Sequence, residues 1–189
     1  MSESQSGARR YPRTFGGLIG SMIVLVLAVV GYYTYQNLTH DQPDVKPVAV
    51  DYRGTVREVQ QAGVTVAYPR LLPQGWIVRD SDSMFVPGDR PVWQVPMLTG
   101  DGEFVGIHQT NAPLDDLLDK DLPQGARQGE DVQIPSGLDG VSTWSSWTDG
   151  TRDHAFATTL GDDTLLVYGS APVEDLKKLI GLLTTAPVA

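Results

Sequence analysis

Residues that could carry out chemistry are few in this sequence and lie far apart along it. The three histidines are His40, His108 and His154, and cysteine is absent. Zinc sites use histidine, cysteine or carboxylate ligands at characteristic short spacings, which His108 and His154 do not show. We therefore expect both to be ordinary polar residues on strand faces. The lack of cysteine also excludes a thiolate nucleophile and a disulfide framework.

Signatures of common hydrolases and nucleotide-binding proteins are also absent. The sequence has no G-x-S-x-G, no S-x-x-K, and no glycine-rich phosphate loop after a predicted strand. The densest acidic stretches, residues 80–82 and 115–121, lack the D-x-D-x-D-G loop and later glutamate of a calcium site. The sequence thus predicts no catalytic, cofactor-binding or metal-binding residue, and a protein that is not an enzyme.

Charge is distributed unevenly between the two parts of the chain. The whole sequence has 14 Lys and Arg against 23 Asp and Glu, a net charge of −9. Residues 1–40 carry three arginines and one glutamate, so the remainder has a net charge of −11. A nucleic-acid-binding protein needs a basic face, so we expect no nucleic-acid partner.

A long apolar segment follows the N-terminal arginines. No charged residue occurs between Thr14 and Thr39, and the apolar run from Phe15 to Tyr35 is long enough to cross a bilayer as a helix. A cleaved signal peptide would have a shorter apolar core and a small-x-small cleavage site, whereas this run ends in tyrosines typical of a membrane interface. The pattern predicts a transmembrane helix over residues 15–39 that is not cleaved.

The flanking charges predict the orientation of this helix. Arg9, Arg10 and Arg13 precede it, and positive flanks face the cytoplasm. Residues 1–14 are then a cytoplasmic N-terminus, residues 40–47 a proline-containing linker, and residues 48–189 an extracytoplasmic domain in a single-pass plasma-membrane protein. Within the helix, Gly16, Gly17, Gly20 and Ser21 form a small-residue stripe that would allow close packing of a partner helix.

The outer part has the pattern of an α+β domain. Apolar residues at helical spacing predict helices over residues 51–62, 113–119 and 172–183. Ser170 and the acidic first turn are expected to mark the start of the last helix. Strands are expected over residues 64–68, 77–86, 92–98, 103–110, 132–134, 141–147, 154–160 and 164–168, with the clearest hairpin turn at residues 99–102. We predict an antiparallel sheet of six or seven strands packed with helices.

Trp144 and Trp147 could mark an interaction surface. They lie three residues apart in a predicted strand, and so they should point to opposite faces of the sheet. Large aromatic side chains usually lie in a core, so one of the two should lie outside the main core or under a helix. An exposed tryptophan there would be a candidate docking surface.

Several blocks of sequence carry a family resemblance. They are R-R-Y-P-R-T before the apolar helix, L-P-Q-G-W at residues 72–76, the block from Trp93 to Thr110, and G-S-A at residues 169–171. The chain resembles actinobacterial single-pass membrane proteins of the domain-of-unknown-function 4245 family. This resemblance implies an exposed domain on the plasma membrane and supplies no catalytic residue. The turn and tryptophan at residues 72–76 are also similar to Mog-one and PsbP-like sandwich proteins, which concerns the fold alone.

Two kinds of function agree with these observations. The first is a non-catalytic interaction domain, an accessory subunit of a larger plasma-membrane or envelope complex, for example a respiratory assembly. Its partners would be other membrane proteins, bound through the transmembrane helix and the acidic outer domain, with the lipid bilayer around the helix. The alternative is an envelope domain that binds a lipid or glycan, which requires an apolar cavity between sheet and helix.

Overall fold

The computed structural model describes residues 22–23, 25–30, 51–79, 84–122 and 125–188. The chain divides into two compact units, residues 1–46 and 47–189. In the first unit, residues 22–23 and 25–30 are helical and their side chains are exposed. Within the described ranges, no helix combines the length and apolar character needed to cross a membrane. Most of the predicted membrane helix over 15–39 lies outside the described residues, as do the N-terminus over 1–14 and the linker over 40–47.

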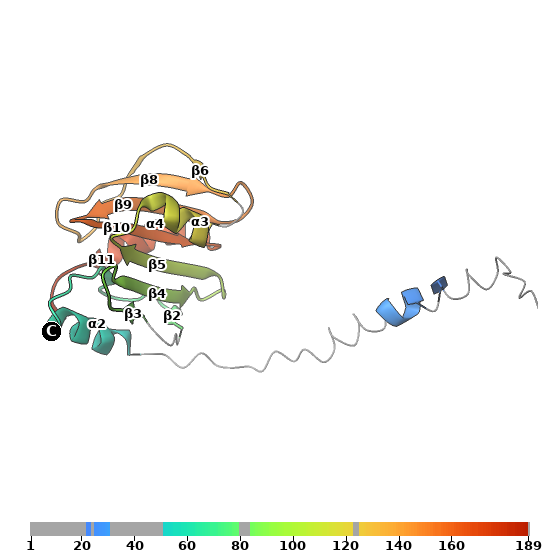
Figure 1. The fold of residues 1–189 in the computed structure, drawn as a ribbon, viewed down its shortest axis with the longest axis horizontal. Coiled ribbons are helices and arrows are strands. Elements are labelled where there is room, and N and C mark those ends of the chain that lie inside the picture. Colours follow the sequence, from blue (N-terminus) through green and yellow to red (C-terminus); the bar gives the residue numbers. More distant parts are fainter. Residues whose placement is uncertain (1–21, 24, 31–50, 80–83, 123–124, 189) are drawn as a thin grey trace, which may run out of the picture. The chain divides into compact units, whose positions relative to one another are not determined.

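The second unit is an α+β domain, as the sequence predicts (Figure 1). Its helices are α2 (Tyr52–Gln61), α3 (Leu114–Asp121) and α4 (Val173–Leu182), close to the three predicted ranges. Helix α2 forms where the spacing indicates, because Tyr52, Val56 and Val59 all face the core. The start of α4 differs from expectation. Ser170 does not cap the helix, and its hydroxyl instead accepts from Phe104 N and donates to Glu103.

A large antiparallel sheet forms the centre of the domain. Its long strands are β4 (Val92–Leu98), β5 (Phe104–Thr110), β10 (Asp163–Gly169), β9 (His154–Leu160) and β8 (Thr143–Thr148), in that spatial order. Two short strands, β2 (Ile77–Val78) and β3 (Phe85–Val86), both pair with the same edge of β4, one near each of its ends. On the other side, β6 (Arg127–Gln128) and β7 (Val132–Gln133) pair in the same way with β8.

The prediction of six or seven strands was too low. The main sheet has nine strands in the part of the chain that the structure describes, and β1 (Tyr68–Pro69) and β11 (Leu183–Thr184) form a separate pair. The extra strands are only two residues long, too short for the alternation of polar and apolar residues that identifies a strand. The strand expected over 64–68 is reduced to Tyr68. The backbone of Thr65 and Ala67 instead bonds to the side chains of Gln109 and Trp93.

Side chains on the two faces of the sheet belong to different hydrophobic clusters. Helices α2 and α4 share the larger cluster with one face, which includes Leu165 and Val167 of β10. Helix α3 shares the smaller cluster with the opposite face, where it packs on Leu166 and on Ala155 and Ala157 of β9. Figure 1 shows α3 over β9 and β10, with β5 and β4 beside it. Two helices therefore cover one face and a single short helix covers part of the other.

Candidate docking surface on the α3 side of the sheet

A buried polar network connects α3 to the sheet. Nδ1 of His108 lies 2.5 Å from Oδ2 of Asp121, and the two side chains are only 4% and 6% exposed. Nε2 of His108 lies 3.3 Å from Nε2 of Gln94 on the neighbouring strand. Burial and the negative charge of Asp121 both raise the pKa of the Tyr168 hydroxyl. The carboxylate at the end of α3 is thus held by His108 of β5.

Strand register places these groups on one face. His108 lies between Gln94 of β4 and Leu166 of β10, and Gly106 lies between Pro96 and Tyr168. A Cβ at Gly106 would lie 2.7 Å from Cε1 of Tyr168, so glycine is needed for the tyrosine ring to cross the strand there. The ring also packs edge-on against Phe104, with centroids 5.6 Å apart.

The network is suited to structure rather than catalysis. A histidine held by a carboxylate becomes a general base when its other nitrogen faces a nucleophile or the substrate. Here the other nitrogen faces the Gln94 amide and is buried. No group of three or more possible metal ligands occurs among the described residues. We interpret the His108–Asp121 contact as a clamp that fixes α3 on the sheet.

Burial raises the pKa of Tyr168 far above its ordinary value of 10.0, and the negative charge of Asp121 adds to this effect. Below about pH 10 the phenol is neutral in both folded and unfolded chains, so the stability is unaffected. Above it the unfolded chain ionises first, and the free energy of unfolding should fall as the pH rises. In an alkaline titration followed by tyrosinate absorbance, one phenol should ionise only when the chain unfolds. That step should be absent in the Tyr168→Phe variant. Ionisation of Tyr168 together with exposed tyrosines would contradict this.

The half of this face beside α3 carries apolar side chains that belong to neither hydrophobic cluster. We call this the β4–β5 patch, and its members are Ile77, Val86, Val92, Pro96, Leu98 and Phe104. The pairs Ile77–Leu98 and Leu98–Phe104 lie opposite one another at one end of β4, and Val86–Val92 lie opposite one another at the other end. Gln94, paired with His108, lies between the two apolar groups. Val86 is 46% exposed and the other five are half-buried. Exposed apolar side chains gathered on one face are typical of interaction sites.

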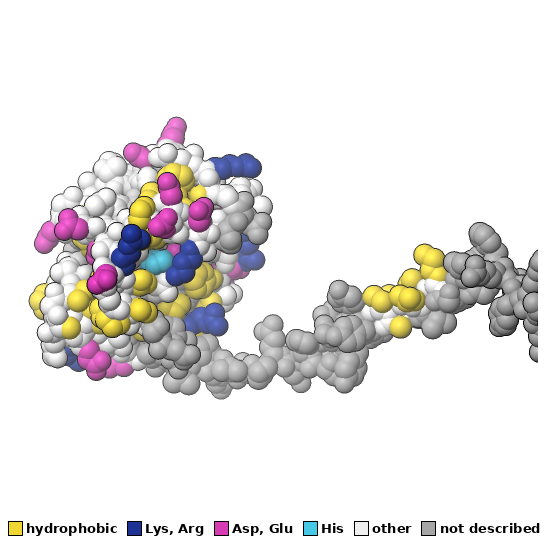
Figure 2. All heavy atoms as spheres, viewed as in Figure 1, with side chains coloured by type: hydrophobic (Ala, Val, Ile, Leu, Met, Phe, Trp, Pro, Cys, Tyr) yellow, Lys and Arg dark blue, Asp and Glu magenta, His cyan; other side chains and the backbone are white. Residues whose placement is uncertain are grey.

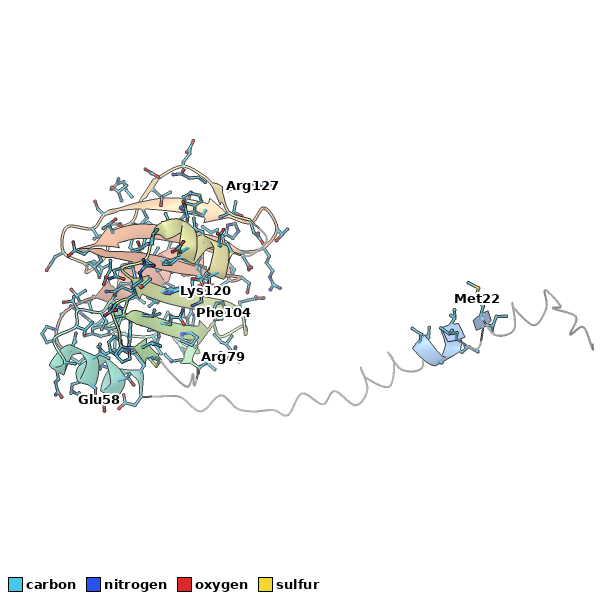
Figure 3. All side chains as sticks on the ribbon, in the orientation of Figure 1. Met22, Glu58, Arg79, Phe104, Lys120 and Arg127 are labelled. Carbon is cyan, nitrogen blue, oxygen red and sulfur yellow. The ribbon has the colours of Figure 1, made fainter. Side chains whose placement is uncertain are left out.

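Charges are arranged unevenly around the patch. Asp115, Asp116 and Asp119 are exposed on α3. In Figure 2 the acidic side chains lie mainly over the α3 half of this face, while Lys and Arg border the hydrophobic half. Arg79 continues strand β2, because its N–H donates to Pro96 O, and it lies beyond the patch from α3. Figure 3 shows Lys120, Phe104 and Arg79 in sequence down this face.

The two tryptophans point to opposite faces, as the strand spacing predicts. Trp144 lies in the larger cluster with no exposed surface, so it cannot form a docking surface. Trp147 is half-buried beside the smaller cluster and donates its indole N–H to Ser145 Oγ at 3.1 Å. The small-residue stripe of Gly16, Gly17, Gly20 and Ser21 lies outside the described residues.

Two clefts of the described domain differ from a typical lipid pocket. One, of about 470 Å³, is lined by Asp139, Asp162 and Asp163 together with Gln109, Val64 and Leu160. An apolar hollow of about 210 Å³ lies between Phe156 of β9 and Val173 of α4, with Lys177 at its side. Ligand pockets usually measure roughly 300–1,000 Å³ and are mainly apolar.

Sequence reasoning did not single out Asp121, Arg79, Lys120 or the β4–β5 patch. In the acidic stretch over 115–121, Asp115, Asp116 and Asp119 are exposed, whereas the Asp121 side chain is buried. Helical spacing gave a signal for this, because Asp121 follows Leu117 and Leu118 at the positions that face the sheet.

Comparison with known proteins gives one match. The family model described as "Protein of unknown function (DUF4245)" matches residues 10–183. The chain belongs to this family. No curated protein and no solved structure matches the chain. The likeness to PsbP-like sandwich proteins therefore stays a prediction.

Proposed function

We propose that this member of the DUF4245 family is a non-catalytic interaction protein, anchored in an actinobacterial plasma membrane with its α+β domain outside the cell. It would serve as an accessory subunit of a larger membrane or envelope complex, such as a respiratory assembly. The observation that carries this proposal is the β4–β5 patch, an apolar surface beside α3 that neither hydrophobic cluster includes. The buried polar groups next to the patch bind one another and offer no group for catalysis.

The apolar segment over 15–39 supports the membrane part of the proposal. A helix confined to the bilayer keeps the domain near the membrane surface and raises the effective concentration of its contacts. Its small-residue stripe around Gly20 would add a contact inside the bilayer. A lipid- or glycan-binding role has less support, because the apolar hollow beside α4 is small and three aspartates line the larger cleft.

Copurification from native membranes in mild detergent tests the proposal. We expect a membrane protein to copurify in a fixed ratio with the full chain, and its yield to fall for Gly20→Leu. A fragment starting at Val48 should capture less of the same partner, because it lacks the membrane helix. Isolation of a lone protein carrying a bound lipid or glycan would favour the alternative function. Equal capture by the fragment and the full chain would contradict a role for the anchor.

A further inference from the structure

The two faces of the sheet differ in how many helices cover them. Helices α2 and α4 pack on one face, whereas α3 alone packs on the other and lies over β9 and β10 (Figure 1). The β4–β5 patch is therefore lower than α3 by about the thickness of a helix, roughly 10 Å. We infer that the β4–β5 patch binds an amphipathic, acidic helix of a partner protein, which lies beside α3 and completes the helical layer. This inference rests on the proposed function.

The dimensions of the patch fit one helix. From Leu98 to Val92, strand β4 covers about 20 Å, since a strand rises about 3.4 Å per residue. A helix of about 14 residues has the same length. Its apolar stripe would pack on Phe104 and Pro96 near one end and on Val92 near the other, with a polar residue opposite Gln94 between them.

The charges predict the polar residues of the partner. Arg79 lies on one border of the patch, and Lys120, in the last turn of α3, lies on the other. Both side chains are exposed, and no ion pair involves either of them among the described residues. Carboxylates on both sides of the apolar stripe would pair with them. The partner helix is therefore acidic even though the domain that binds it has a net negative charge.

The height difference between α3 and the patch argues against a lipid surface as the occupant. A flat bilayer approaching this face would meet α3 first, with the exposed carboxylates of Asp115, Asp116 and Asp119. Anionic headgroups would be repelled there before the acyl region reached the patch. The acidic helix α3 of a second copy packs its apolar side chains on its own sheet, so it has no apolar stripe to place on the patch. A narrow acidic helix that exposes an apolar stripe avoids both difficulties.

Photo-crosslinking in native membranes tests the inference. A benzophenone amino acid replaces Val86 in the full chain, or Leu71 as a control, because both side chains are largely exposed. We expect the Val86 probe to form an adduct with one protein, at a segment of about four helical turns with an apolar stripe and carboxylates. The Leu71 probe should not mark that segment. The variant Arg79→Glu/Lys120→Glu should reduce the adduct at least tenfold, and Lys178→Glu should not, because Lys178 is exposed on α4.

Reversing the charges on both partners gives the decisive test of the inference. Replacing the captured segment's carboxylates with lysine should restore the adduct to the Arg79→Glu/Lys120→Glu chain. Tryptophan fluorescence should show that this chain stays folded. Adducts to lipid, to a second copy of this chain, or to a neutral or basic segment would overturn the inference, as would no adduct. If a partner still copurifies in those cases, the proposed function stands and only its site is wrong. If no protein copurifies, the proposed function itself fails.

Discussion

Asp121→Ala should lower the free energy of unfolding by about 2 kcal/mol, because it removes the acceptor of the buried His108 side chain. Oδ2 of Asp121 lies 2.5 Å from Nδ1 of His108, and the His108 side chain is 4% exposed. Each buried donor left without an acceptor costs about 1–3 kcal/mol. Urea unfolding of the full chain in mild detergent, followed by tryptophan fluorescence, measures the loss, since all four tryptophans lie in the domain.

Two further variants distinguish the loss of the His108–Asp121 contact from the loss of any carboxylate on α3. Asp119→Ala changes an exposed carboxylate on the same helix, and its effect should stay within about 0.5 kcal/mol. The double variant His108→Leu/Asp121→Leu removes both polar partners together, so it should lose less stability than the sum of the single changes. Equal stability of Asp121→Ala and Asp119→Ala would show that the clamp contributes nothing.

Gly169→Ala should be still more damaging, with an expected loss of about 4 kcal/mol. Gly169 ends strand β10 with a φ of +153°, and a Cβ there would lie 2.1 Å from the carbonyl oxygen of Phe104. That oxygen also accepts from Ala171 N, so it cannot move away freely. Backbone strain and overpacking each cost about 1–3 kcal/mol. Thermal unfolding should show a midpoint lowered by roughly 10 °C or more.

Gly102→Ala is the matched control for this prediction. Gly102, in the hairpin between β4 and β5, also has a positive φ of +81°, but a Cβ there would meet no atom within 4 Å. Only strain applies, and the loss should be about 1 kcal/mol. If both variants lose the same stability, the close approach of Phe104 to Gly169 does not matter.

Local patterns predicted much of the fold. The spacing of Tyr52, Val56 and Val59 indicated α2, and all three side chains face the core. The turn over residues 99–102 indicated the hairpin of β4 and β5, in which Thr99 N donates to Glu103 O. The odd spacing of Trp144 and Trp147 indicated opposite faces. Each of these features depends on neighbours in the sequence.

Features that depend on tertiary contacts were not predicted. The His108–Asp121 pair exists because α3 folds back over β5, and no local spacing fixes that crossing. The β4–β5 patch could not be recognised because its members alternate with core residues such as Met97 and Val95, as in any half-buried strand. That α3 leaves it uncovered follows from the placement of one helix over β9 and β10 rather than over β4.

The short strands on both sides of the sheet have a consequence for the protein at high local concentration. On one side β2 and β3, and on the other β6 and β7, each contribute two residues, and they pair with β4 and β8. A long, flat edge would expose a continuous row of backbone donors and acceptors that templates edge-to-edge polymerisation. Here that row is interrupted on both sides. Many copies at high concentration would therefore resist forming β-aggregates, while the faces of the sheet stay available for side-chain recognition.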